Sequence, residues 1–301
     1  MTARTLRPRI VAAGAALAAG TLLLTACGSS GDSSTGGSSA GSSAPLYSKL
    51  PADIQKAGVV KVGSEVAYAP VEYKQGDKIT GIDPDLAEAL GKQLGVKFQI
   101  QDAGFDTLIT SLSTGRIDLI MSAMTDNKER QGKGVDFVDY FSAGTSILVQ
   151  KGNPKGIKTL EDLCGQTVAL QKATVNEDTA KAQSEKCKAA GKAEITIQGY
   201  EHDGEALLKL KSGAAVADLN DYPVAAYNAQ TSGGGKDFEV VGEQIDPGLY
   251  GIGVSKDDAQ LRDAVKAGVD ALIANGEYAK ILEKYNVKLG AVTEAKINGG
   301  S

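Results

Sequence analysis

The stretch Ile117–Arg130, IDLIMSAMTDNKER, combines an apolar strand, a polar turn and the start of a helix. Gly115 lies just ahead of the apolar residues, which predict a buried strand. Asp126 or Asn127 can cap a helix that begins at Lys128. Arg130 then falls in the first helical turn, where a guanidinium beside free backbone N–H groups suits a carboxylate. The alternative is a strand, a turn and a helix whose arginine is only solvated.

The residues before this stretch predict an alternation of strands and helices. Strands are expected at residues 59–66 and 96–100, and a short helix at 105–113. Between the two strands, Asp83 and Pro84 are expected as the N-cap and first residue of a helix that Gly95 ends. The order β-α-β-α-β predicts a parallel, doubly wound sheet.

A second α/β set follows and predicts a second domain. Its pattern resembles the first, because residues 108–125 and 206–223 both contain an amphipathic helix, a glycine and an apolar strand with a polar end. A late strand that returns to the first domain gives two crossovers and therefore a hinge. The last residues, NGGS, are expected to fray. The strands are expected at 142–150, 167–171, 194–200, 215–219, 240–245 and 250–254, and the helices at 159–163, 176–190, 204–211, 257–274 and 276–285.

The polar ends of two matching strands predict the binding site. In open α/β sheets ligands bind at the carboxyl ends of strands, which here are Ser122–Thr125 and Asn220–Asp221. Facing each other, they place Arg130 on one wall of a cleft and Asp221 on the other, which matches a zwitterion. Alternatively, Asp218 and Asp221 are solvated turn residues.

The N-terminus predicts export and a lipid anchor. Three arginines within residues 1–9 precede an apolar run at 10–24 that is too short for a stable membrane span. The run ends in Leu-Thr-Ala-Cys, similar to a bacterial lipobox, so cleavage after residue 26 leaves Cys27 as the acylated terminus. An ordinary secretory signal with a chance cysteine is the alternative. Residues 28–45 are rich in Gly and Ser and predict a flexible tether, so the domain is expected at the outer face of a membrane.

Composition limits the class of protein. The formal charge of −5 includes the three leader arginines, so the mature chain carries −8 and has no basic run for nucleic acid. Cys164 and Cys187 remain once Cys27 is acylated, and in an exported chain they are expected to pair; two buried thiols are the alternative. His202, the only histidine, is expected alone on a surface loop, so no His-paired nucleophile, metal cluster or cofactor is predicted.

With these residues in place, the chain resembles the extracellular solute-binding proteins of family 3, which bind polar amino acids for ATP-driven importers. The resemblance extends from about Val59 to Tyr285. It implies an α/β, two-lobed periplasmic-binding-protein-like fold (Venus flytrap), with two doubly wound domains joined by a two-strand hinge. The matching segments are VGSEVAYAPVEY, GIDPDLAEALGKQLG, FDTLITSLSTGRIDLIMSAMTDNKERQGKGVDF, VALQKATVNE, DLNDYPVAAY, LYGIGV and IANGEYAKILEKY.

The resemblance also implies a role for each site residue. Arg130 is expected to bind the ligand α-carboxylate, with Thr125 and the backbone around Thr174 and Val175. Asp221 is expected to take the α-ammonium, with the backbone of Ser122 or Ala123 and the Thr125 hydroxyl. The residues expected around the ligand side chain are Tyr68 and Phe105 on its two faces, and Glu65 and Gln171 at its polar end.

Two departures from the family pattern bear on the ligand. Ala173-Thr174-Val175 stands where the family usually has Gly-Thr-Thr, and Glu65 stands where aspartate is usual. The longer Glu65 is expected to select a donor-bearing or cationic side chain, such as that of glutamine, lysine, ornithine or arginine. Against this, Lys172 could point inward and favour an acidic ligand.

The expected partners are a free L-amino acid and an ABC permease, with the chain a lipid-anchored monomer on a Gram-positive cell, acylated by palmitate or a similar chain. A sensor that presents an amino acid to a membrane receptor is an alternative, and a dehydratase-like enzyme of the same fold is a weaker one. The expected domains are the signal peptide 1–26, Cys27 with the linker to 45, the first lobe 46–146, the second lobe 147–243, the return of the first lobe 244–290, and a tail 291–301.

Overall fold

The computed structural model describes residues 43–301. The predicted signal peptide, the acylated Cys27 and the linker as far as residue 42 lie outside the described residues. Within residues 43–301, no helix is long and apolar enough to cross a membrane.

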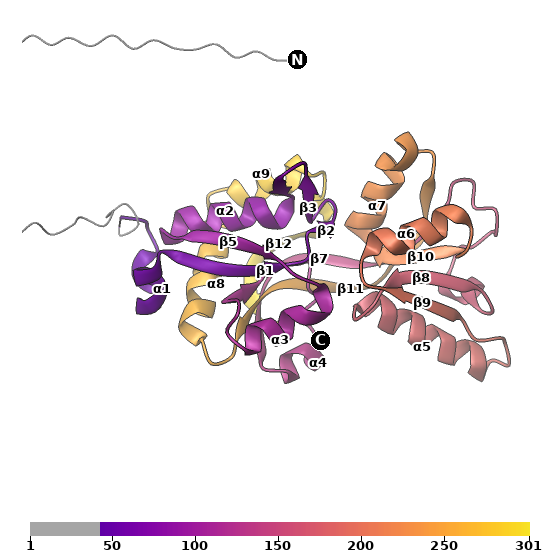
Figure 1. The fold of residues 1–301 in the computed structure, drawn as a ribbon, viewed down its shortest axis with the longest axis horizontal. Helices are drawn as coiled ribbons and strands as arrows, with labels where there is room; N and C mark the ends of the chain where they lie inside the picture. Colours follow the sequence, from indigo (N-terminus) through magenta and orange to yellow (C-terminus); the bar gives the residue numbers. More distant parts are fainter. Residues whose placement is uncertain (1–42) are drawn as a thin grey trace, which may run out of the picture. The chain divides into compact units, whose positions relative to one another are not determined.

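One mixed sheet organises the described residues, in the order β5-β1-β6-β11-β7-β10-β8-β9 (Figure 1). β1 pairs in parallel with both β5 and β6, and β8 pairs in parallel with both β9 and β10, as the two alternating patterns predict. The strands are β1 Val59–Ser64, β5 Lys97–Asp102, β6 Leu119–Ile120, β7 Val135–Gln150, β8 Thr167–Gln171, β9 Thr196–Tyr200, β10 Ala217–Asp221, β11 Phe238–Ser255 and β12 Ala291–Ile297.

Two long antiparallel strands, β7 and β11, join the two halves of the sheet. One end of β11 pairs with β6, while the far end of β7 pairs with β10. We call the half with β1, β5 and β6 the first lobe, and the half with β8, β9 and β10 the second lobe. The two-strand connection was predicted, but its strands are longer than expected. β7 begins at Val135 instead of Ser142, and the two strands expected at 240–245 and 250–254 are one strand with bulges.

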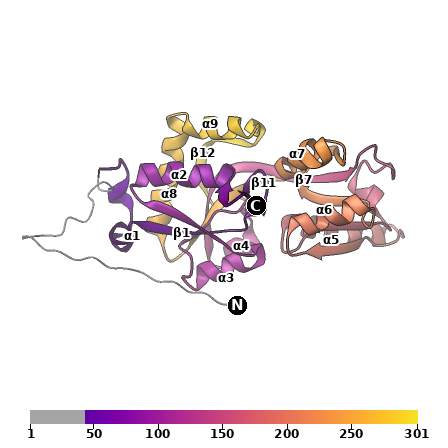
Figure 2. The ribbon, with the colours of Figure 1, turned by 45° about the horizontal axis from the view of Figure 1, so that its top comes forward.

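Helices cover both lobes, and each lobe has its own apolar core. α2, α8 and α9 pack together beside the first lobe, while α5, α6 and α7 pack around the strands of the second (Figures 1 and 2). The helices are α1 Ala52–Ala57, α2 Ile82–Leu94, α3 Leu108–Ser113, α4 Lys128–Gly132, α5 Val175–Ala189, α6 Asp203–Ser212, α7 Tyr222–Thr231, α8 Ala259–Ala274 and α9 Glu277–Lys284. Short 3₁₀ turns lie at Tyr47–Lys49, Phe105–Thr107, Leu160–Leu163, Ser232–Gly234 and Lys288–Gly290.

Helix α2 forms where predicted but begins differently. Its leucines at i, i+4 and i+8 are buried, and Gly95 ends it in the left-handed conformation. The N-cap, however, is Gly81. Its φ is +135°, and a Cβ added at this position would lie only 2.2 Å from the Val71 carbonyl oxygen. Asp83 is therefore not the cap. It is a fully buried residue of the first turn, and its carboxylate binds other parts of the lobe.

A small second sheet was not predicted, and it adds Glu72 to the cleft beside the predicted Tyr68. Strands β2 (Ala67–Tyr68), β3 (Glu72–Gln75) and β4 (Lys78–Thr80) form an antiparallel sheet directly after β1. It directs Tyr68 and Glu72 inward, and both side chains are buried.

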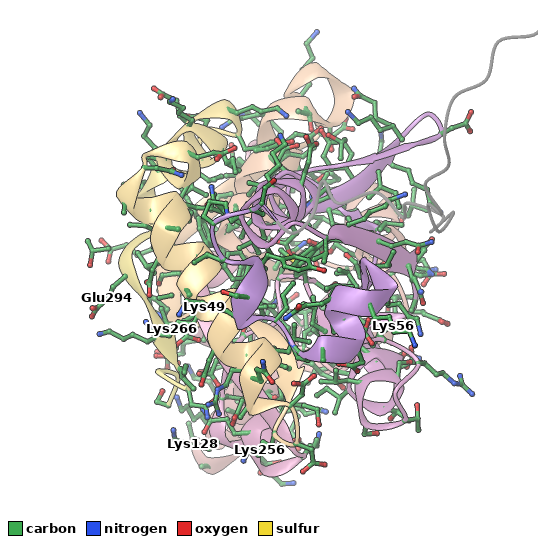
Figure 3. The ribbon with its side chains drawn as sticks, turned by 90° about the vertical axis from the view of Figure 1, so that its left-hand side faces the viewer. Lys49, Lys56, Lys128, Lys256, Lys266 and Glu294 are labelled. Atoms are coloured by element: carbon green, nitrogen blue, oxygen red, sulfur yellow. A yellow bond between two sulfur atoms is a disulfide. The ribbon has the colours of Figure 1, made fainter. Side chains whose placement is uncertain are left out.

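The C-terminal tail is ordered, in contrast to the expected fraying. β12 pairs antiparallel with β7, and beyond it the amide of Gly300 donates to Asp126 at 2.7 Å. Lys128 of α4 donates to the Gly300 carbonyl at 2.9 Å. Figure 3 views the first lobe from its left-hand end in Figure 1, with Lys128 of α4 and Glu294 of β12 labelled near its outline. The tail therefore packs against the segment that precedes Arg130.

A disulfide joins Cys164 and Cys187 in the second lobe, with a Cα–Cα distance of 5.6 Å. It links the turn before β8 to the last turns of α5. The prediction that the two cysteines pair is confirmed, and the alternative of two buried thiols is wrong.

Candidate functional site

A narrow cavity lies at the carboxyl ends of the strands, between the two lobes. The side chains that line it leave room for only about one water molecule. Every residue that the sequence assigns to the ligand lines this cavity, together with two that it does not, Glu72 and Asn176. The full lining is Glu65, Tyr68, Glu72, Phe105, Ser122, Ala123, Thr125, Arg130, Gln171, Thr174, Val175, Asn176 and Asp221.

Arg130 is positioned by the local sequence as predicted. Asn127 is the N-cap of α4, and its Oδ1 accepts from the Arg130 amide at 2.9 Å. The guanidinium donates to the carbonyls of Thr125 at 2.8 Å and Ala173 at 3.1 Å, and it lies 5.4 Å from the centre of the Phe105 ring. The side chain is 6% exposed, so the alternative of a merely solvated arginine is wrong.

The Arg130 guanidinium has no carboxylate partner in the described part of the chain, because both of its hydrogen bonds go to carbonyl groups. Burial lowers the pKa of Arg130, which nearby carboxylates, Asp221 first among them, only partly offset. A buried cation held by neutral oxygens is costly without an anion. The arrangement therefore suits an anionic group that enters the cavity.

Asp221 ends β10 and faces the first lobe. Its two carboxylate oxygens accept from Asn176 Nδ2 at 3.0 Å and from the Tyr250 hydroxyl at 2.6 Å. Burial raises the pKa of Asp221, and these neutral donors lower it again. Asp221 and Asp218 are both buried, so the alternative of solvated turn residues is wrong.

A chain of hydrogen bonds crosses the cleft beside Asp221. The Tyr68 hydroxyl donates to Asn220 Oδ1 at 2.5 Å, and Asn220 Nδ2 donates to Asp203 Oδ1 at 2.6 Å. Burial raises the pKa of Asp203 to about 7. Tyr68 thus joins the wall of the first lobe to the end of β10, while its ring lines the cavity.

Glu65 follows the end of β1 and is 2% exposed. Its amide donates to Ser122 Oγ at 3.0 Å, and that hydroxyl donates to Glu72 Oε1 at 3.1 Å. Its carboxylate Oε1 lies 2.7 Å from His202 Nδ1, across the cleft. Burial raises the pKa of Glu65, and the His202 contact lowers it.

His202 was predicted to stand alone on a surface loop: it is exposed and lies just before α6, as expected, but it does not stand alone. It is the N-cap residue of α6, its side chain is 49% exposed, and its ring reaches the first lobe. No sequence pattern links it to Glu65, because the two residues lie 137 positions apart.

Glu72 lines the cavity although the sequence did not predict it. It is fully buried, and its Oε2 has no hydrogen-bond partner among residues 43–301. Burial, followed by the nearby carboxyl groups of Asp83 and Glu65, raises its pKa well above the usual range. Asp83 in turn accepts from the Ala123 amide at 3.3 Å and the Tyr140 hydroxyl, which fixes the turn that carries Ser122 and Ala123.

The remaining polar lining residues come from the second lobe. Gln171 ends β8 and donates to the Glu201 carbonyl at 3.0 Å. Thr174 is the N-cap of α5: its hydroxyl donates to the Gln171 carbonyl at 2.7 Å and accepts from the Glu177 amide at 3.2 Å. These bonds hold the turn that brings Thr174 and Val175 to the cavity.

The sequence of the chain matches that of a known family. The sequence pattern of the bacterial extracellular solute-binding proteins, family 3, matches residues 60–288. The chain belongs to this family.

Relatives of this solute-binding protein bind amino acids. The arginine-binding protein ArgT of Corynebacterium glutamicum is 32% identical over 255 residues, 84% of this chain and 82% of that protein. An ancestral arginine-binding protein, solved bound to arginine, is similar with a TM-score of 0.69 at 35% identity, over 76% of this chain and 98% of that one.

A third similar protein bears on catalysis. It is an ancestral amino acid-binding protein described as a precursor of cyclohexadienyl dehydratase, with a TM-score of 0.70 at 36% identity over 77% of this chain and 97% of that one. This precursor is itself named as an amino acid-binding protein. ArgT is likewise named as a binding protein and not as an enzyme.

Ala173, which departs from the family glycine, is strained. Its φ is +60°, a left-handed conformation that glycine adopts at no steric cost and alanine does not. Its amide donates to Glu177 Oε2 at 2.7 Å, and its carbonyl receives Arg130, so contacts on both sides hold the strained residue. Lys172 does not line the cavity. It pairs with Asp106 at 3.0 Å near the cleft, so the alternative of an inward lysine is wrong.

Proposed function

We propose that this solute-binding protein captures a cationic L-amino acid of the arginine, lysine and ornithine class and delivers it to an ABC permease. One observation carries the proposal: a single cavity holds Arg130, which lacks a carboxylate partner within the described residues, together with the buried carboxyl groups of Asp221 and Glu65. One cation and two anions complement an amino acid that has one carboxylate and two cationic groups.

Each group of the ligand then has a partner. The α-carboxylate binds Arg130, with the Thr125 hydroxyl and the amides of Thr174 and Val175. The α-ammonium binds Asp221, with the turn at Ser122 and Ala123. The side chain lies between Tyr68 and Phe105 and ends at Glu65 and Gln171. Arginine fits this order best, because a guanidinium offers several donors to a carboxylate in a fixed geometry.

Binding requires the lobes to open. The cavity holds about one water molecule, so a ligand enters only when the contacts across it separate. We propose that residues 147–243 move as one lobe against residues 46–146 and 244–290 about β7 and β11. A ligand that touches both walls shifts the population towards the closed form, which a permease then recognises.

The location follows from the same proposal. A cleaved leader, an acylated Cys27 and a Gly/Ser tether hold the binding domain, as a monomer, at the outer face of the membrane of a Gram-positive cell. A membrane receptor is the alternative recipient of the bound amino acid.

The test is a calorimetric binding panel on the full chain, unfolded and refolded with its disulfide intact to remove carried-over ligand. L-arginine, L-lysine, L-ornithine, L-histidine, L-glutamine and L-glutamate are the ligands. The expected result is tight binding of the first three and recovery of each ligand chemically unchanged. Tight binding of glutamate but not of basic amino acids would overturn the ligand class, and altered ligand would reveal an enzyme.

Import and sensing are separated in cells. If the chain serves an importer, deleting its gene abolishes uptake of labelled arginine at low external concentration. If it serves a receptor, uptake continues and the response to external arginine is lost instead.

A further inference from the structure

Among the described residues, the contact between His202 and Glu65 is the one that joins the two lobes through an imidazole. A buried carboxylate on one wall meets a half-exposed imidazole on the other, with Oε1 and Nδ1 2.7 Å apart. Glu65 is also the group that the proposed function assigns to the ligand's side-chain cation. His202 does not line the cavity, but in this conformation it already contacts the carboxylate that the proposal assigns to the ligand's side-chain cation.

The charges around this pair are nearly all negative. Glu201 and Glu205 face the imidazole from its own helix end, and Glu65 faces it from the first lobe. Asp102 and Glu72 of the first lobe and Asp203 of α6 face the Glu65 carboxylate. Lys172 lies near Glu201 but pairs with Asp106. Such surroundings raise the pKa of His202 from its ordinary value of 6.5, the Glu65 hydrogen bond first among the causes.

We propose that His202 is a specificity-determining residue that competes, as an imidazolium, with the ligand's side-chain cation for Glu65. The inference rests on the proposed function and names what regulates the same site. A cationic side chain that reaches Glu65 displaces the imidazole towards solvent, where half of its surface already lies. The imidazolium then loses its anionic partner and gains a cation nearby, so it releases one proton to the buffer.

The sign of the pH dependence follows from this exchange. His202 holds its proton more tightly in the ligand-free form than in the complex, so binding releases a proton between the two pKa values. Affinity for a cationic amino acid therefore rises with pH, from about pH 6.5 upwards, by up to tenfold per pH unit where one full proton is released. A neutral side chain leaves the imidazolium on Glu65, so its affinity does not change in this way.

The experiment compares L-arginine with L-citrulline, its neutral isostere, on the full chain. Calorimetry in phosphate, HEPES and Tris at about pH 7 gives the number of protons released, because these buffers differ in ionisation enthalpy. We expect proton release with arginine and none with citrulline. The chain has one histidine, so a released proton that disappears in His202→Asn is assigned to the exchange at the His202–Glu65 contact.

Two variants test the competition directly. His202→Asn keeps a good N-cap residue for α6 but cannot carry a charge. It should bind arginine several-fold more tightly than the wild type at about pH 6.5, without proton release. His202→Lys places a permanent cation there and should bind arginine more weakly, with no pH dependence over the same range.

Lys172→Gln is the matched control. It removes another cation that crosses between the lobes, the partner of Asp106, and it leaves Glu65 untouched. Proton release on arginine binding should persist in this variant. Unchanged proton release in His202→Asn would overturn the inference while the proposed function stands. If arginine fails to bind the wild type at all, the proposed function itself fails.

Discussion

Arg130 and Glu65 line the same cavity with opposite charges, but they are held by different kinds of partner. Arg130 is fixed by backbone carbonyls, one from each lobe, which neither titrate nor rotate away. Glu65 is held by a half-exposed imidazole that can do both. The difference separates a constant feature of amino acid ligands, the α-carboxylate, from a variable one, the side chain.

The largest effect is expected from removing the guanidinium that the carbonyls fix. Arg130→Met should weaken arginine binding by about 3–5 kcal/mol, because the ligand carboxylate would be buried without its cation. Calorimetry measures the loss. Lys133→Gln, at the C-cap of the same helix, is the control, since it removes only an exposed pair with Glu129 and should leave affinity unchanged. Equal losses in both variants would mean that α4, and not the guanidinium, is what binding needs.

Asp83 is a buried acid with fixed partners, and its effect is measured on the stability of the fold. Burial raises the pKa of Asp83 to about 6 from 3.8, so the unfolded chain releases this proton first. The free energy of unfolding should therefore fall as pH rises from about 4 to 6, by on the order of 3 kcal/mol for this group. Urea unfolding at several pH values, compared with Asp83→Asn, measures the contribution.

Glu88→Gln is the matched control for Asp83. Lys92 lowers the pKa of this exposed carboxylate on the same helix, so its stabilisation is lost as pH falls, the opposite sign. A wild-type and Asp83→Asn difference that stays flat with pH would show that folding does not raise the pKa of Asp83.

Removing the charge of Glu65 should weaken arginine binding less than removing that of Arg130. Glu65→Gln should weaken binding of arginine by about 2 kcal/mol and that of citrulline by far less, because only the cation loses an anionic partner. The ratio of the two affinities is the measurement. If both ligands weaken equally, Glu65 shapes the cavity but does not select charge.

The smallest effect concerns the carbonyl that Arg130 receives from the second lobe. Ala173→Gly removes the left-handed strain and should stabilise the protein by about 1 kcal/mol, seen as a higher midpoint in urea. Affinity should stay close to that of the wild type, since the Ala173 carbonyl is retained. A destabilised variant would mean that the neighbouring hydrogen bonds, and not strain, dominate at this turn.

What the sequence predicted was set by local signals. The Asn127 cap, the leucines of α2 and the strand β8 appear at their expected residues, because capping and apolar periodicity act over a few positions. The set of lining residues was also predicted, because several segments resemble those of the family and point to positions that lie far apart in the chain.

What the sequence did not predict depends on distant partners. The first part of β7 was missed because Asp136 and Asp139 look solvated, whereas Asp136 is paired with Arg262. Helix α7 was missed because Pro223 after Asp221 indicates a turn, although proline also suits a first helical turn. His202 gains its role only when the lobes meet, and Glu72 gains its role only when the small sheet packs against Ser122 within the first lobe.

The hydrogen bond from Tyr250 to Asp221 also makes the protein its own optical probe. Tyr250 lies on β11, one of the two strands that join the lobes, and its ring packs 5.5 Å from that of Phe141. An ammonium that binds Asp221 changes the electrostatic surroundings of this phenol. Because the chain contains no tryptophan, the emission of its ten tyrosines is not masked by indole fluorescence, and the change at Tyr250 on occupancy of the cavity contributes to that emission.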